Sequence, residues 1–190
     1  GEAAITSALI DVTNESSPKL YFISGHGELS PHDTTPNRGL SKLTEQLSEQ
    51  NYEIERLDLN QTGNIPGDAN LLILADPQGP LLPSEVELLR QYLLNDAGRL
   101  LIWISPGNQT GLKPLFLEWG LLSPDMVIFE RGRDYIESTG NFLVRNFAEH
   151  DITEALINNQ TFLVSGFTRP ILPNNDTPVD DRLNRTPLMA

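Results

Sequence analysis

The chain has 190 residues, of which 26 are acidic and 13 are basic, so its formal net charge is −13, and it contains no cysteine. We expect one soluble domain, which at this length buries about two-thirds of its unfolded surface. The missing cysteines exclude a disulfide scaffold, a Cys-ligated metal site and a thiol nucleophile. The acidic excess repels phosphate groups and anionic lipid headgroups, which argues against nucleic-acid partners.

Apolar runs in the sequence are short. The longest are Leu71–Ala75 and Leu100–Ile104, far below the roughly 20 residues of a membrane-spanning helix. We therefore expect no direct membrane insertion by this chain. It begins Gly1-Glu2 without a signal-like segment and ends at Met189-Ala190 without a polar tail, so we expect a piece excised from a longer protein.

The first part of the chain predicts alternating helices and strands. In chain order the apolar pattern predicts a helix over 3–12, a strand over 19–24, a helix over 40–50, an exposed edge strand over 52–59 and a linker over 60–70. The helix over 40–50 carries Leu40, Leu43 and Leu47 at the spacing of one helical face. A β-α-β alternation follows from this order.

The strongest strand pattern lies over 71–77, which is apolar on both faces, as is typical of the middle of a parallel sheet. Ser84 with Glu87 predicts a capping box for the next helix, and Gly98 predicts its left-handed terminator. A second buried strand over 99–106 and a helix over 112–119 come next. These elements predict an α/β fold, a three-layer, doubly wound, mainly parallel sheet of flavodoxin-like type with central order 2-1-3-4.

The C-terminal third predicts shorter elements. They are strands over 126–130, 135–137, 142–145 and 161–164, some of them antiparallel, and a helical turn or two over 152–156. The region after 170 is rich in Pro, Asn and Asp and poor in apolar residues. We predict one α/β domain over 1–170 and a partly disordered or extended tail over 171–190.

Polar residues follow the predicted parallel strands, where open sheets bind ligands. The candidate ligand-binding residues are Ser24, Gly25, His26, Gly27, Glu28, Asp76 and Ser105. His26 and Glu28, together with His32 and Asp33, are candidate ligands of a divalent metal or a general acid–base pair. The alternative interpretation is a tight glycine turn in which His26 binds a neighbouring loop, and we assign no catalytic residue.

Known cofactor and nucleophile motifs are missing from the sequence. The Gly25-x-Gly27 pair lacks the third glycine of a dinucleotide fingerprint, and no GxxxxGK[ST] motif occurs. Neither Ser24 nor Ser105 lies in a G-x-S-x-G motif. We therefore expect no cofactor and no enzymatic activity.

Six short segments together carry a family resemblance through their order and spacing. They are Ser17–Glu28, Leu57–Leu59, Ile65–Ala69, Leu71–Pro77, Gly98–Leu101 and His150–Leu156. They resemble the GldG-type auxiliary component of ABC transporters, a family first associated with gliding motility. The resemblance implies a fold similar to class I glutamine amidotransferases and to the matching domain of intraflagellar-transport proteins.

The same resemblance implies a cellular setting. The parent would be a membrane-anchored bacterial protein whose extracytoplasmic (periplasmic) domain works beside an ABC permease and an ATPase. Amidotransferases use a cysteine nucleophile, and this chain has none.

The sequence alone leaves three functions open. The leading one is a non-enzymatic domain for protein–protein interaction or ligand sensing. The alternatives are a small-molecule or metal-dependent hydrolase that uses the Gly25–Glu28 loop, and a carbohydrate-binding module.

Overall fold

The computed structural model describes residues 17–36, 38–95, 98–130, 132, 135–136, 141–176 and 186–188. The chain divides into two compact units, here called the N-terminal unit (Gly1–Ile104 with Asn108–Leu112) and the C-terminal unit (Ser105–Gly107 with Lys113–Ala190). The helix predicted over 3–12 lies outside the described residues. The extent of the domain predicted over 1–170 stays a prediction.

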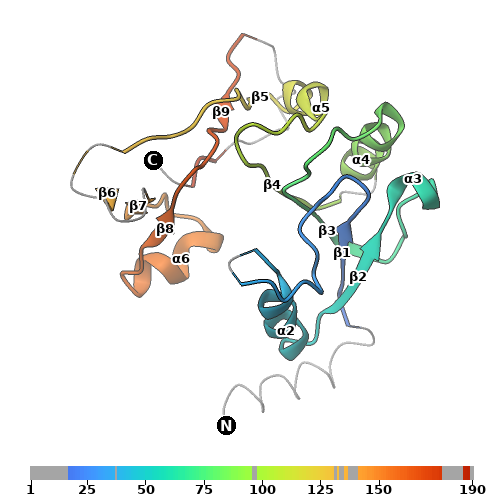
Figure 1. The fold of residues 1–190 in the computed structure, drawn as a ribbon, viewed down its shortest axis with the longest axis horizontal. Coiled ribbons are helices and arrows are strands. Elements are labelled where there is room, and N and C mark those ends of the chain that lie inside the picture. Colours follow the sequence, from blue (N-terminus) through green and yellow to red (C-terminus); the bar gives the residue numbers. More distant parts are fainter. Residues whose placement is uncertain are drawn as a thin grey trace. The chain divides into compact units, whose positions relative to one another are not determined.

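A four-stranded parallel sheet forms the centre of the N-terminal unit (Figure 1). Its strands are β1 (Lys19–Ile23), β2 (Glu53–Leu57), β3 (Ala69–Ala75) and β4 (Leu100–Trp103), in the order β2-β1-β3-β4. All three strand pairs are parallel. The predicted α/β fold and its central order are confirmed, and β2 is the exposed edge strand.

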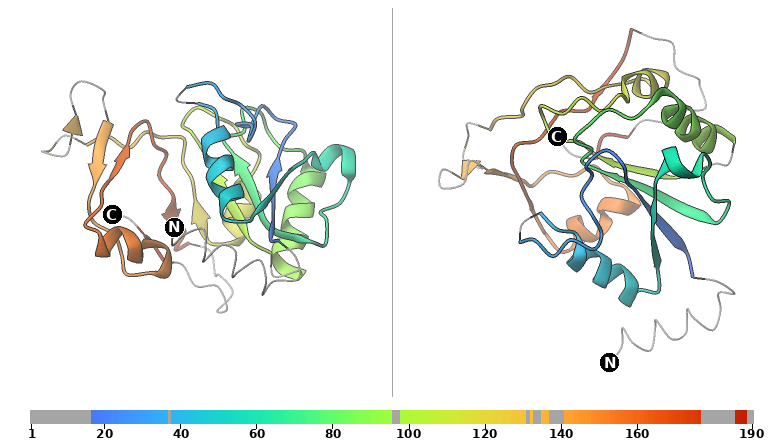
Figure 2. Two further views of the ribbon diagram at one scale, coloured as in Figure 1. Left: turned by 90° about the horizontal axis from the view of Figure 1, so that it is seen from below. Right: turned by 45° about the vertical axis from the view of Figure 1, so that its right-hand side comes forward.

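Helices cover both faces of this sheet. Figure 2 shows α2 (Ser41–Glu49) on one side and α4 (Pro83–Asn95) on the other. On the α2 side, Leu40 and Leu47 pack against a buried cluster of Leu20, Phe22, Ile73 and Ala75. The alternate residues of β1 and β3 face the α4 side because successive side chains of a strand point to opposite faces; these are the buried residues Tyr21, Ile23, Leu72 and Leu74. Because helices cover both faces of the sheet, this unit has three layers.

A short helix replaces the end of one predicted strand. The helix α3 (Leu59–Thr62) begins directly after Asp58, whose carboxylate accepts the backbone N–H of Gln61 at 3.0 Å. The strand expected up to Leu59 is therefore wrong after Leu57, because the Asp58 side chain caps a helix there.

The first turn of α4 corrects the predicted capping box. The helix begins at Pro83, so Ser84 lies inside the helix, and Glu85 occupies the third helical position. Glu85 Oε2 accepts the backbone N–H of Leu82 at 2.7 Å. The reach-back contact of a capping box is thus made by Glu85 instead of Glu87, because proline is favoured at the first helical position.

Gly98 is also not the left-handed terminator that the sequence predicts. Its φ lies outside the left-handed region, and a Cβ atom at this position would lie 2.3 Å from Tyr92 Cε1. Tyr92 is buried, and its hydroxyl donates to the carbonyl oxygen of Ala69 at 3.2 Å. Glycine is needed here because the backbone passes against the tyrosine ring.

The described residues of the C-terminal unit form two small sheets and two helices. The helices are α5 (Lys113–Glu118) and α6 (Asp151–Asn158), and the strands are β5 (Leu121–Leu122), β6 (Tyr135–Ile136), β7 (Asn141–Val144), β8 (Leu163–Ser165) and β9 (Leu172–Pro173). β5 pairs with β9, and β6-β7-β8 form a sheet, all antiparallel. The extra short strands of the C-terminal third are confirmed.

One detail of this unit differs from the sequence prediction. The strand predicted over 126–130 does not form; there the N–H of Ile128 donates to the carbonyl oxygen of Thr168 at 2.8 Å. β9 lies within the segment predicted to be a partly disordered or extended tail, where it pairs with β5 and the N–H of Asn174 donates to the carbonyl oxygen of Gly120. Within the described residues, the helices are too short or too polar to cross a membrane.

A charged cluster lies at the start of β1. Lys19 Nζ is 2.8 Å from Asp68 Oδ2 and 3.6 Å from Glu53 Oε2, and the Tyr21 hydroxyl donates to Asp68 Oδ1 at 3.0 Å. The hydrogen bonds from Lys19 and Tyr21 hold the pKa of Asp68 below its ordinary value of 3.8. The hydrogen bond to Asp68 raises the pKa of Lys19, and burial raises that of Tyr21.

We predict that the Asp68→Asn substitution lowers Tm at neutral pH and that this difference shrinks in acid. Because the pKa of Asp68 is lowered in the folded state, its carboxylate stabilises the fold above the unfolded pKa of 3.8, and the contribution is lost as pH falls through the folded pKa. Thermal unfolding followed by circular dichroism between about pH 2 and pH 6 measures this. A Tm difference that is equal at all pH values would contradict the prediction. In a Lys19→Met background, the effect of Asp68→Asn on Tm should be smaller.

Candidate functional site

The loop after β1 is tied to the loop after β3. The carbonyl oxygen of His26 accepts the backbone N–H groups of Gln78 at 2.8 Å and Gly79 at 3.0 Å. Gly27 has φ +79, and a Cβ atom there would lie 3.0 Å from Gln78 Cβ. Glycine therefore serves both the left-handed backbone and the close approach of the two loops.

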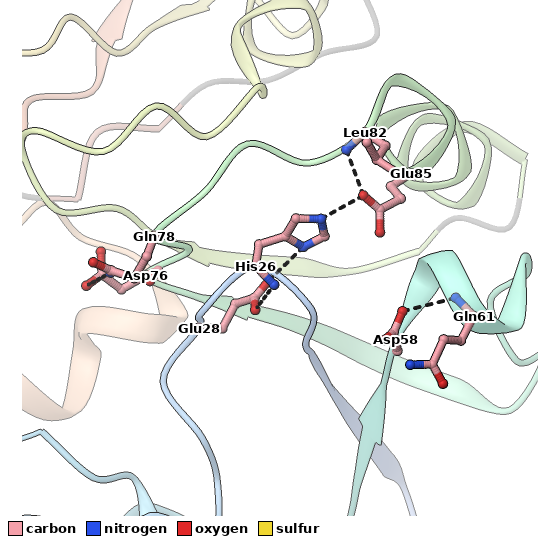
Figure 3. Close-up of polar contacts among 8 residues, drawn as sticks. All are labelled: His26, Glu28, Asp58, Gln61, Asp76, Gln78, Leu82 and Glu85. Atoms are coloured by element: carbon pink, nitrogen blue, oxygen red, sulfur yellow. Dashed lines mark hydrogen bonds and ion pairs between the residues drawn. The ribbon is translucent and has the colours of Figure 1, made fainter.

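His26 lies between two buried carboxylates (Figure 3). Its Nδ1 is 3.2 Å from Glu28 Oε1, and its Nε2 is 2.9 Å from Glu85 Oε2. The two glutamate side chains are each 1% exposed and the histidine side chain is 13% exposed. The backbone N–H of His26 also donates to Glu28 Oε2 at 2.7 Å. We call His26, Glu28 and Glu85 the histidine cluster.

Glu85 has two roles in the histidine cluster. Its Oε2 atom accepts the N–H of Leu82 at the start of α4 and also faces the imidazole of His26. Its Oε1 atom is buried and has no hydrogen-bond partner among the described residues. One side chain thus connects the helix α4 to the loop after β1.

The two contacts of the imidazole set its chemistry. An ionised carboxylate only accepts hydrogen bonds, so contacts to two ionised carboxylates are both hydrogen bonds when both ring nitrogens carry protons. Such an imidazolium between two carboxylates is a charge-assisted link between two parts of the fold. The arrangement can hold the loop and the helix together.

Asp76 forms a separate polar group after β3. It has φ +54, a left-handed conformation that aspartate tolerates better than most residues. Asn108 Nδ2 donates to its Oδ1 at 3.2 Å, and Gln78 Nε2 donates to its Oδ2 at 3.0 Å. These contacts join the end of β3 to the segment after β4 within the N-terminal unit.

The place between β1 and β3 is the topological switch point of the sheet. From β1 the chain runs to β2 on one side, and β3 lies on the other side of β1. Doubly wound folds bind ligands in the crevice at such a point. Here the backbone bonds from Gln78 and Gly79 to His26 join the two loops directly across it.

The remaining candidates do not join the histidine cluster. Asp33 accepts from the hydroxyl and the backbone N–H of Thr35 at 2.6 and 2.8 Å, and the hydroxyl bond is the main cause of its lowered pKa. The backbone N–H of His32 donates to the hydroxyl of Ser30. In the part of the chain that the structure describes, no three His, Asp or Glu side chains are grouped so that they could hold a metal ion.

Two further candidates lie outside the cluster, and one member of the cluster was missed. The backbone N–H of Ser24 donates to the carbonyl oxygen of Leu57 at 2.9 Å, and Ser105 belongs to the C-terminal unit. Sequence reasoning missed Glu85, although Pro83 at the first helical position was the signal that places Glu85 at the third. A role in ligand binding for the residues of these loops stays a prediction.

We predict that the His26→Ala substitution destabilises the protein by about 3–5 kcal/mol, because it leaves two buried carboxylates without their shared partner. Urea denaturation followed by fluorescence measures the free energy of unfolding. The matched control is His32→Ala, an exposed histidine, for which we expect a change within about 0.5 kcal/mol. Equal effects of the two substitutions would show that the histidine cluster does not stabilise the fold.

Comparisons with known proteins agree with this architecture. Among solved structures, the chain is similar to one described as "mmIFT52 N-terminal domain", with a TM-score of 0.61 and 22% sequence identity over 83% of this chain and 69% of that chain. At this identity the likeness shows the fold alone. A comparison with curated proteins gives no match.

A family match covers the parallel sheet and the histidine cluster. The model of the family described as "ABC-type uncharacterized transport system" matches residues 17–142, well over half of the chain. This range contains all four parallel strands and both glutamates of the cluster. The chain therefore belongs to the family described as "ABC-type uncharacterized transport system", and its role is associated with transport.

Proposed function

We propose that the chain is a non-enzymatic protein-interaction domain of an ABC transport system, and that it binds the permease and ATPase subunits of the same transporter. The resemblance to the GldG-type auxiliary component supports this assignment and an extracytoplasmic location on a membrane-anchored bacterial parent. Membership of the transport family supports the transporter association.

The distribution of exposed apolar side chains is the observation that carries the proposal. Three large apolar residues are exposed in the described part of the N-terminal unit, namely Leu82, Leu94 and Leu101. In the C-terminal unit, twelve of the described residues are exposed large apolar residues: Met126, Val127, Ile128, Phe129, Ile152, Ile157, Phe162, Leu163, Val164, Phe167, Ile171 and Leu172. A concentration of exposed apolar side chains is typical of protein interaction sites.

The segment Met126–Phe129 is the most continuous part of this surface. Its four side chains are between 40% and 62% exposed. Phe129 packs its ring against Tyr135 at a centroid distance of 5.5 Å and still exposes most of its surface. Aromatic and aliphatic anchors of this kind dominate the energy of protein interfaces.

The histidine cluster supports a structural rather than a catalytic use of the loop after β1. Both ring nitrogens of His26 contact carboxylates of the protein itself. The two loops at the switch point bind each other through their backbone. A hydrolase would use these groups on a substrate, and their contacts within the protein support a structural role instead.

We predict that the double substitution Val127→Ser and Phe129→Ser weakens binding to the purified permease–ATPase complex at least about tenfold, because each buried apolar side chain contributes roughly 1.5–3 kcal/mol. Surface plasmon resonance with the full chain measures the affinity. Leu94→Ser is the matched control, because Leu94 is 63% exposed and belongs to the N-terminal unit. Binding that both variants weaken equally, or no binding by the unsubstituted chain, would overturn the proposal.

A separate experiment tests the proposed extracytoplasmic location of the chain, in bacterial cells that produce the membrane-anchored parent. This chain has no cysteine, so Ser48→Cys, at an exposed position of α2, adds a single thiol to it. We expect a membrane-impermeant maleimide to label this thiol in intact cells, with the parent without the added cysteine as the background. Labelling only after lysis would contradict an extracytoplasmic location.

A further inference from the structure

His26 connects three segments of the N-terminal unit. Its carbonyl oxygen binds the loop after β3, its backbone N–H and Nδ1 contact Glu28 in its own loop, and its Nε2 contacts Glu85 of α4. We infer that the histidine cluster is a pH-sensitive clasp, which fastens the first turn of α4 to the loop after β1 while the cluster holds two protons and releases it when one is lost. This inference does not depend on the proposed function.

The number of protons follows from the contacts. Two nitrogen–oxygen contacts of the ring are hydrogen bonds only if each contains one proton. After the loss of one proton, a nitrogen lone pair faces a carboxylate oxygen, and an attractive contact becomes repulsive. The two protons belong to the cluster as a whole, because coupled groups titrate together.

The contact with Glu85 is the one that opens. Glu28 is held locally, since its Oε2 atom accepts the backbone N–H of His26, two residues away. Glu85 comes from α4, and its Oε1 atom is buried without a partner in the described part of the chain. Moving the Glu85 side chain toward water would hydrate this oxygen, so release relieves a desolvation cost that the closed clasp carries.

Each of the neighbouring segments contributes an acidic side chain near the clasp. Glu28 lies in the loop itself and Glu85 on α4. Asp58, the cap of α3, lies 3.7 Å from the position of a Cβ atom at Gly25. Asp76, after β3, contacts Gln78, whose N–H binds His26. Of these four carboxylates, those of Glu28 and Glu85 contact the His26 ring directly.

The test compares hydrogen exchange with the protonation of the ring in the full 190-residue chain. Amide protection of Leu82, relative to that of Leu74 in the buried strand β3, is measured between about pH 5 and pH 9 while NMR follows the His26 ring. We expect the protection of Leu82 relative to that of Leu74 to fall about tenfold as the His26 ring loses its proton. The reason is that a charge-assisted hydrogen bond from His26 holds Glu85, the side chain that caps Leu82.

Two variants separate the clasp from a general effect of pH. In His26→Gln there is no ring whose lone pair could come to face Glu85 as the pH rises, so the tenfold fall in relative protection should be absent. The protection of Leu74 shows that the fold of this variant is intact. His32→Gln should behave as the unsubstituted chain does. A relative protection that stays constant in the unsubstituted chain, or that falls equally in His26→Gln, would overturn the inference.

Discussion

The parallel pairing of β1 with β3 is the constraint on which the N-terminal unit depends. Both strands are buried and apolar on their two faces, so helices must cover each side. Parallel strands also require crossover connections, which place the loops after β1 and β3 at the same edge of the sheet. The meeting of His26 with Gln78 and Gly79 is a consequence of this pairing.

The parts of the fold that the sequence predicts correctly are those with strong local patterns. The continuous apolar runs of β1, β3 and β4 indicated strands, and their alternation with helices indicated the strand order. The prediction that the strand over 99–106 is buried is wrong, because β4 lies at an edge of the sheet and its Leu101 is 40% exposed. The errors lie where a single side chain overrides the pattern. Asp58 caps a helix after β2, and the run Met126–Phe129 has a strand-like composition without a sheet to join.

The sequence identified two of the three residues of the histidine cluster. His26 and Glu28 are two residues apart, and their chemistry suggested a pair. Glu85 lies on another element, and its contact with His26 depends on the packing of α4 against the sheet, which no local pattern shows. The correct start of α4 at Pro83 would have identified Glu85 as a capping residue, but not as the partner of an imidazole.

The histidine cluster lies beside the switch point of the sheet, where the loops after β1 and β3 bind each other. Burying two carboxylates is costly unless a cation pairs with them and hydrogen bonds satisfy their oxygens. His26 contacts both carboxylates, and the backbone N–H groups of Leu82 and His26 donate hydrogen bonds to them. Among the four carboxylate oxygens of the histidine cluster, Oε1 of Glu85 is the one that is buried without a hydrogen-bond partner in the described part of the chain. The contacts at this edge of the sheet therefore hold the first turn of α4 to the loop after β1.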